Sequence, residues 1–318
     1  MKLKHYYILL GTFIIFSFIK ANVIPLPVSN TDSNLKNEPL YVYFFNVGQG
    51  SFTLLKHGDK ALIIDAGSLD RKFSEIKEIF ETHLGNAKIK AILLTHNSHE
   101  HHNFVKTLRK HYCDDDCAIL SIYKQKIRLS HEKKHCEYLS FLVSSDLQQL
   151  SSFLSYKFPK LSFKFPIQLA PFSATKVTDP SLITSIEYQG IKLLFTGAAT
   201  AKQLNYFVDT KRHYNDAEKI NLIQNNTQIF NHVNIFILPT DTAQILPWST
   251  FIANHNSQKL TTIFLGNIQT LPNLNLLAPS IKNNLFFTCD SKNFPYFKIE
   301  NHSIFKYDFY KKCFINLF

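Results

Sequence analysis

The chain contains little of several residues that mark common protein classes. Its 318 residues include only 9 glycines, one methionine and one tryptophan. Charged residues make up 19% and hydrophobic residues 45%. This balance excludes a disordered polyelectrolyte and supplies a core for one large domain or two small ones.

Motifs of several catalytic classes are missing as well. The sequence has no Gly-x-Ser-x-Gly nucleophile elbow, no phosphate-binding loop that ends in Gly-Lys-Ser/Thr, and no paired Cys-x-x-Cys motif. It also contains no internal repeat and no long low-complexity tract. These absences argue against a serine hydrolase of the elbow type, a P-loop nucleotide hydrolase and a four-cysteine zinc module.

The N-terminus has the layout of a secretory signal peptide. Lys2 and Lys4 precede an apolar core over residues 6–19, and Ala21 suits the position before a cleavage point. That core is shorter than the roughly 20 apolar residues that a membrane span needs. We therefore expect residues 1–21 to be a signal peptide of an exported protein, with an uncleaved membrane anchor as the alternative. Residues 22–39 are predicted to be a linker, and residues 40–318 one domain with an aromatic-rich closing segment.

Five cysteines leave at least one without a partner in the chain. Cys113 and Cys117 flank three aspartates in "HYCDDDC". In an exported chain a disulfide between these two, or from either one to Cys136, fits the sequence. A metal site at this motif would lack a recognised ligand spacing.

The net charge of +11 favours anionic partners. The basic residues are scattered, however. The chain is rich in Lys, Asn, Ile and Phe, and an A+T-rich genome could produce this composition without selection for anion binding. The charge is therefore only a cue to an anionic ligand or nucleic acid. The partner stays unknown, and nothing in the sequence indicates an obligate oligomer.

From residue 40 onward, short apolar runs alternate with amphipathic ones. The runs "LYVYFFNV", "SFTLLKHG" and "KALIIDAGS" predict three strands, and "RKFSEIKEIFETHLGN" predicts a helix. A buried strand, "AKIKAILLTH", then leads into a cluster of histidines. A strand pair that turns at Gly190 and further alternating strands and helices follow. The order predicts an α/β protein with two sheets packed on each other between helices.

The histidine cluster is the densest chemical feature of the chain. The stretch "LLTHNSHEHHN" holds His96, His99, Glu100, His101 and His102 directly after the predicted strand. Imidazoles and carboxylates in such density are the usual ligands of zinc and related ions. Spacing alone leaves open a second interpretation, a solvated histidine-rich loop.

The order of four segments resembles the metallo-β-lactamase fold superfamily, and within it the branch that includes the metal-hydrolase domain of the competence protein ComEC. The first segment, residues 44–68, contains "NVGQGS" and "IIDAG". Residues 89–104 contain "LLTH", residues 181–200 contain "LLFTG", and residues 233–243 read "VNIFILPTDTA". The resemblance extends over about residues 40–267. It implies an αββα sandwich with two divalent ions that share a bridging hydroxide. The implied ligands are a His-x-His/Asp-x-Asp-His motif, an aspartate after a Thr-Gly strand end and a histidine in a later loop.

The first ligand motif of this family is altered here. In an ungapped match His96 and His101 occupy the first and last histidine positions. Ser98 falls at the second position, and Glu100 replaces the aspartate. A one-residue bulge could instead bring His99 into the second position, and the sequence leaves both registers open.

The later ligand positions are altered as well. Ala198 stands where the bridging aspartate is implied, and Thr240 and Asp241 replace the histidine pair. Asp241 still offers a carboxylate that could bind zinc or manganese. Asp65 is kept, and the resemblance implies that it supports a ligand rather than acting as one.

Two hypotheses follow. In the first, the protein has a degenerate metal site, is non-catalytic or strongly altered, and acts by binding, with no ion or one ion. In the second, it is a single-metal hydrolase of a phosphodiester or other anionic substrate. His96, His101 and Asp241 would then hold one zinc or manganese ion. Glu100 or His99 would orient or deprotonate the attacking water.

Overall fold

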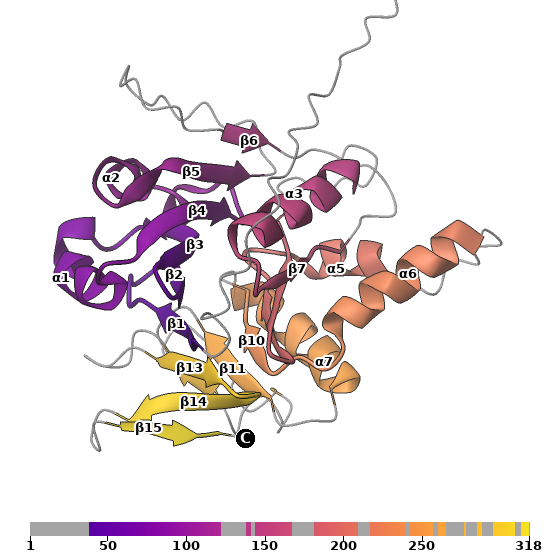
Figure 1. Ribbon diagram of the computed structural model, residues 1–318. Coiled ribbons are helices and arrows are strands. Elements are labelled where there is room, and N and C mark those ends of the chain that lie inside the picture. The colour runs from indigo at the N-terminus through magenta and orange to yellow at the C-terminus, as the bar shows by residue number, and fades with distance from the viewer. Residues whose placement is uncertain are drawn as a thin grey trace, which may run out of the picture. The chain divides into compact units, whose positions relative to one another are not determined.

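The computed structural model describes residues 38–121, 138–140, 144–166, 181–208, 217–239, 242–256, 260–264, 277, 285–287, 295–308 and 313–317 (Figure 1). The predicted signal peptide, most of the predicted linker, Cys136 and Asp241 lie outside these residues. The N-terminal boundaries therefore stay predictions. Within the described residues, no helix combines the length and apolar character needed to cross a membrane.

One sheet has nine strands in the order β15-β14-β13-β1-β2-β3-β4-β5-β6. Antiparallel pairs join the strands from β15 to β3, and parallel pairs join those from β3 to β6. Residues 296–316, in the aromatic-rich C-terminal segment, contain β13 to β15 and extend the sheet beyond β1. The bounds are β1 Leu40–Phe44, β2 Gly50–His57, β3 Lys60–Ser68, β4 Lys88–Leu94, β5 Cys113–Ser121, β6 Tyr138–Ser140, β13 Tyr296–Glu300, β14 Ser303–Asp308 and β15 Cys313–Asn316.

The second sheet has six strands in the order β12-β11-β10-β9-β8-β7. The predicted turn at Gly190 is confirmed, because Gln189 and Gly190 adopt positive φ angles of 48° and 74° between β8 and β9. The bounds are β7 Ser162–Lys164, β8 Thr184–Tyr188, β9 Ile191–Phe195, β10 Ile235–Ile237, β11 Thr261–Phe264 and β12 Leu285–Phe287.

The two sheets pack face to face, and each is covered by helices on its outer side (Figure 1). Phe44 and Phe195 meet between the sheets, with ring centroids 6.5 Å apart. Helices α1 (Phe73–Leu84) and α2 (Val105–His111) cover the nine-stranded sheet. The six-stranded sheet is covered by α5 (Ala201–Val208), α6 (Ala217–Phe230) and α7 (Ile245–His255), while α3 (Ser144–Lys157) packs into the central core. The predicted αββα fold class is confirmed.

Trp248 belongs to the core of the α5–α7 layer. It is fully buried, and its Nε1–H donates to the Ala199 carbonyl at 2.8 Å. We expect Trp248→Phe to lower the free energy of unfolding by about 2 kcal/mol, because it opens a cavity and leaves a buried carbonyl without that donor. Urea denaturation followed by circular dichroism measures the loss. Leu246→Ala, in the same helix but 40% exposed, is the control and should change stability by less than about 0.5 kcal/mol. Equal losses would contradict the packing role.

His83, in the last turn of α1, is expected to make the free energy of unfolding depend on pH. Its ring lies 4.4 Å from that of Tyr43 between centroids, and burial and the Lys56 charge lower the pKa of His83 to about 4. The unfolded chain binds this proton near pH 6.5, so stability falls as the pH drops from about 6.5 to about 4. Because the side chain is partly exposed, we expect a loss of about 1 kcal/mol.

Unfolding free energies at pH 7 and pH 4.5 test this expectation. His83→Gln should abolish the extra loss at low pH, and His111→Gln, at an exposed position, should retain it. An identical pH profile for the wild type and His83→Gln would contradict the assignment.

Candidate functional site

The candidate site lies where β4 ends at the edge of the nine-stranded sheet. The carbonyl oxygen of Thr95, the residue after β4, accepts hydrogen bonds from the Leu182 backbone N–H at 2.7 Å and the Ser181 hydroxyl at 3.0 Å. The Ser181 hydroxyl oxygen in turn accepts the Ala198 backbone N–H at 3.0 Å. Strand ends of both sheets therefore meet around Thr95.

Gly197 permits this convergence. Its φ is +57°, and a Cβ there would lie 2.3 Å from the Ser181 hydroxyl oxygen and 2.5 Å from the Thr95 hydroxyl oxygen. Only glycine combines that backbone angle with so close an approach. The Thr-Gly strand end seen in the sequence is thus a packing requirement that places Ala198 beside the end of β4.

Asp65 is the buried acceptor behind the site. It is 1% exposed and has a positive φ of 53° within β3. Its Oδ1 accepts the Thr95 backbone N–H at 2.7 Å, and its Oδ2 accepts the Thr95 hydroxyl at 2.7 Å. The same Oδ2 lies 2.9 Å from Nδ1 of the fully buried His101. Because a carboxylate only accepts, Nδ1 of His101 carries the proton, and in the neutral ring the lone pair is on Nε2.

His96 lies beside His101, with ring centroids 5.3 Å apart. Its Nδ1 is 2.7 Å from the Ser98 hydroxyl and 3.2 Å from the Ser98 backbone N–H. The Ser98 hydroxyl also hydrogen-bonds the Glu100 carboxylate. When the hydroxyl donates to Glu100, its oxygen accepts Nδ1–H of His96 and the ring's lone pair is on Nε2. The backbone N–H contact favours the opposite tautomer, so the two contacts with Ser98 bear on which ring nitrogen carries the proton.

Glu100 is ionised at neutral pH. Burial raises its pKa, but hydrogen bonds from its own backbone N–H and from the Ser98 hydroxyl, together with electrostatic interactions with His101 and His96, outweigh burial and lower the pKa below its usual range. The carboxylate is thus bound to the loop that carries the histidines.

The other two histidines of the cluster are oriented differently. His99 begins the short helix η2 (His99–His101) and is exposed. His102 donates from Nε2 to the Asn97 carbonyl at 3.1 Å, and burial lowers its pKa. Ser98 contacts His96, and both registers of the ligand motif stay predictions.

Glycines let the η2 turn press against the sheet. A Cβ on Gly67 would lie 2.5 Å from the backbone C and O atoms of Glu100, and one on Gly50 would lie 2.3 Å from the Gly67 carbonyl oxygen. Asn103 fixes the same turn, since its Oδ1 accepts the Ser68 N–H at 3.0 Å and its Nδ2 donates to the Ser68 carbonyl at 2.7 Å. These contacts hold His101 against Asp65.

A family model matches this part of the chain. Residues 45–111 match the metallo-beta-lactamase superfamily. The matched segment begins before the Val-Gly-Gln-Gly turn and ends with α2, so it contains Asp65, His96 and His101. No curated protein matches the chain.

Several solved structures are similar to the chain at low identity. The metallo-beta-lactamase fold protein YhfI from Bacillus subtilis is 12% identical, with 82% of this chain and 99% of that chain covered and a TM-score of 0.47. The short form of human tRNase Z is 11% identical, with 70% and 91% covered and a TM-score of 0.39. A diphosphatase of the PhnP family is 11% identical, with 78% and 94% covered and a TM-score of 0.40.

The donors that the described residues bring to this site do not fit a two-ion centre. A catalytic zinc takes three protein ligands, and a second ion requires more. Among the described residues, no group of three or more His, Cys, Asp or Glu side chains could hold a metal ion. His96 and His101 supply two imidazoles, and Ala198 supplies no donor. A one-ion centre would need a further ligand, and the predicted Asp241 lies outside the described residues.

Sequence reasoning identified the histidines and Asp65 but missed the residues that position them. Ser181, Gly197 and Asn103 act through backbone contacts that join segments distant in the sequence. Of these three, only Asn103, which directly follows the histidine cluster, could have been linked to the site from the sequence. The role of Ser98 depends on how the η2 turn folds, and spacing does not reveal that.

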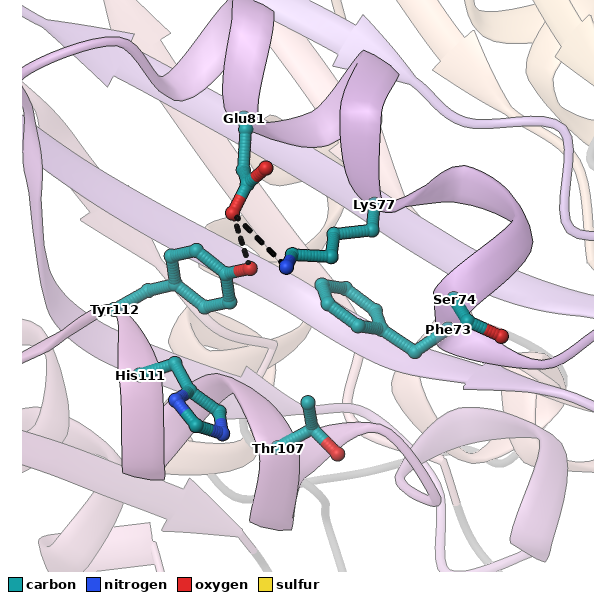
Figure 2. Close-up of a pocket in the computed structure, with 7 residues that line it drawn as sticks. All are labelled: Phe73, Ser74, Lys77, Glu81, Thr107, His111 and Tyr112. Atoms are coloured by element: carbon teal, nitrogen blue, oxygen red, sulfur yellow. Dashed lines mark hydrogen bonds and ion pairs between the residues drawn. The ribbon is translucent and has the colours of Figure 1, made fainter.

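A separate cavity of about 600 Å³ lies between α1 and α2 (Figure 2). Figure 2 shows the Lys77 ammonium and the Tyr112 hydroxyl directed at the Glu81 carboxylate, and the Oε1 of Glu81 is 3.8 Å from Lys77 and 2.8 Å from Tyr112. Burial, followed by the Glu81 contact, raises the pKa of Tyr112 to about 12. Lys77, Glu81 and Tyr112 at this cavity thus satisfy one another. Its lining residues are Phe73, Ser74, Lys77, Glu81, Thr107, His111 and Tyr112, none of which belongs to the candidate site.

Proposed function

We propose that this protein is a metallo-β-lactamase-fold protein with a degraded metal centre that acts by binding rather than by two-metal hydrolysis. Ala198 carries the proposal. Its backbone is hydrogen-bonded to Ser181, which is hydrogen-bonded to Thr95, so this position adjoins the end of β4. A methyl group there replaces the implied bridging carboxylate and donates no electron pair.

The rest of the site supports the interpretation that metal ligands were lost while the residues that position them were kept. Asp65 still holds His101, and Gly67 and Asn103 still fix the η2 turn. We propose an anionic ligand, with nucleic acid included, because the chain carries a net charge of +11 and offers two imidazoles at this edge. We further propose export, based on the signal-like residues 1–21, and kinship with the ComEC-type branch, based on the turn at residues 47–50.

Metal content of the untagged chain tests the degraded centre. After equilibration with zinc or manganese and removal of unbound ion, we expect well below one ion per chain. Ala198→Asp should raise zinc affinity by about tenfold or more, because it returns a carboxylate beside two imidazoles. Ala198→Asn has nearly the same shape without the charge and should leave affinity near the wild-type value. Equal affinities for the Asp and Asn variants would contradict the placement of Ala198 at the site.

A second candidate function is single-metal hydrolysis of a phosphodiester or other anionic substrate. The carboxylate–histidine contact between Asp65 and His101 favours it, because metal-binding histidines in proteins usually have such a partner. Hydrolysis of bis(4-nitrophenyl) phosphate with added zinc or manganese separates the two functions. Turnover that disappears in the His96→Ala/His101→Ala double variant would overturn the binding proposal, whereas turnover no faster than the metal alone supports it.

A further inference from the structure

A bulge at the start of β5 brings two cysteines together. Ile89 of β4 pairs with Cys113, but the next pair in the ladder is Ala91 with Ala118. The chain therefore advances by two residues on β4 and by five on β5, and residues 114–117 leave the regular ladder. The sulfur atoms of Cys113 and Cys117 close the base of this bulge at a distance of 2.9 Å.

Ion pairs hold the bulge in place from two elements. The Lys90 ammonium, which comes from the β4 position opposite the bulge, contacts the Asp114 carboxylate and lies 3.7 Å from that of Asp116. Lys157, at the end of α3, contacts Asp116 as well. The folded structure therefore holds the two thiols close to each other.

The two thiols differ in access to solvent. Cys113 is partly exposed, whereas Cys117 is 1% exposed. A reagent in solution therefore reaches Cys113 first, and Cys117 is placed to react with whatever forms on Cys113. The two sulfur atoms need to approach by about 0.9 Å to reach the length of a disulfide bond.

We propose that Cys113 and Cys117 are a reactive dithiol that forms a reversible disulfide by exchange with a small-molecule disulfide. The Cys113 thiolate attacks one sulfur of the reagent, which forms a mixed disulfide and releases one small thiolate. The Cys117 thiolate then attacks the Cys113 sulfur, forms the intramolecular bond and releases the second small thiolate. The two protons lost by the cysteines go to the two leaving thiolates. The protein loses two electrons, and the reagent gains them.

This inference is independent of the proposed function. Because β4 and β5 are parallel, the bulge lies at the sheet edge opposite the end of β4 that carries His96. Tyr112, the neighbour of Cys113, instead lines the cavity between α1 and α2, and its carbonyl accepts the Ile89 N–H at 3.3 Å. Closure of the disulfide is therefore expected to affect that cavity and to leave metal content unchanged.

The test isolates the pair in a full-length chain with Cys136→Ser, Cys289→Ser and Cys313→Ser. This chain is incubated with oxidised glutathione, its remaining thiols are blocked, and its peptides are analysed by mass spectrometry. We expect one peptide that contains both cysteines and has lost two hydrogen atoms, and reduction should restore its mass. A stable glutathione adduct on Cys113 without closure would overturn the proposal. In the wild-type chain, a bridge from either cysteine to Cys136 would overturn it too.

The order of attack is tested with single substitutions in the same background. Cys117→Ser should accumulate the glutathione adduct on Cys113, and Cys113→Ser should react about tenfold more slowly because its remaining thiol is buried. Labelling of the unsubstituted pair with a maleimide, which needs no new variant, should likewise modify Cys113 first. Equal rates at the two positions would contradict the assigned roles.

Discussion

Asp65→Ala is expected to lower the free energy of unfolding by about 4 kcal/mol. The change removes the acceptor of the Thr95 N–H, the Thr95 hydroxyl and Nδ1–H of His101, all of which are buried. Each orphaned donor costs about 1–3 kcal/mol, and the positive φ of 53° adds strain for alanine. Chemical denaturation followed by the fluorescence of Trp248 measures the loss.

Two further substitutions make this test specific. Asp65→Asn keeps an acceptor for the Thr95 N–H and tolerates the positive φ, so it should cost only about half as much. Asp59→Ala removes an exposed carboxylate near the start of the same strand and should change stability by less than about 0.5 kcal/mol. If Asp65→Ala were as mild as Asp59→Ala, the carboxylate would not organise the end of β4.

Gly67→Ala is expected to cost about 3 kcal/mol, because its methyl group would meet backbone atoms that have little freedom to move. The added Cβ would lie 2.5 Å from the Glu100 carbonyl group and 2.7 Å from the His102 backbone nitrogen. The η2 turn must then move off the sheet, which separates His101 from Asp65. Denaturant midpoints give the stability loss.

Gly85→Ala is the matched control for this substitution. Gly85 has a positive φ of 57°, but a Cβ there would meet only the end of the Lys56 side chain, at 4.0 Å. We expect a loss of about 1 kcal/mol from backbone strain alone. A Gly67→Ala variant no less stable than Gly85→Ala would contradict the close packing of η2 on β3.

Much of the architecture follows from local pattern. The helix predicted from "RKFSEIKEIFETHLGN" forms over Phe73–Leu84, and its buried residues Phe73, Ile76, Phe80 and Leu84 have the spacing of one helical face. The strand before the histidines forms over Lys88–Leu94. Such elements are predictable because a single buried face sets their hydrophobic period.

The details of the candidate site depend on contacts between distant segments. The contact of Ser98 with His96 precedes the η2 turn, and that turn packs on Gly67 rather than following any period in the sequence. The approach of Cys117 to Cys113 was likewise open from spacing, and the bulge in β5 places Cys117 there. Cys136 lies outside the described residues, so its pairing stays a prediction. The contribution of Asp241 stays a prediction.

The pairing of β1 with β13 has a consequence for biosynthesis. Strand β1 lies between β2 and a strand that starts at Tyr296. Strands β1 to β5 are therefore synthesised long before β13, which pairs with the other edge of β1. Until then, the nascent sheet ends in Leu40–Phe44 with unpaired backbone donors and acceptors, an edge that recruits strands from other chains. Because β13 is synthesised late, that edge stays open until the last strands of the sheet have been made.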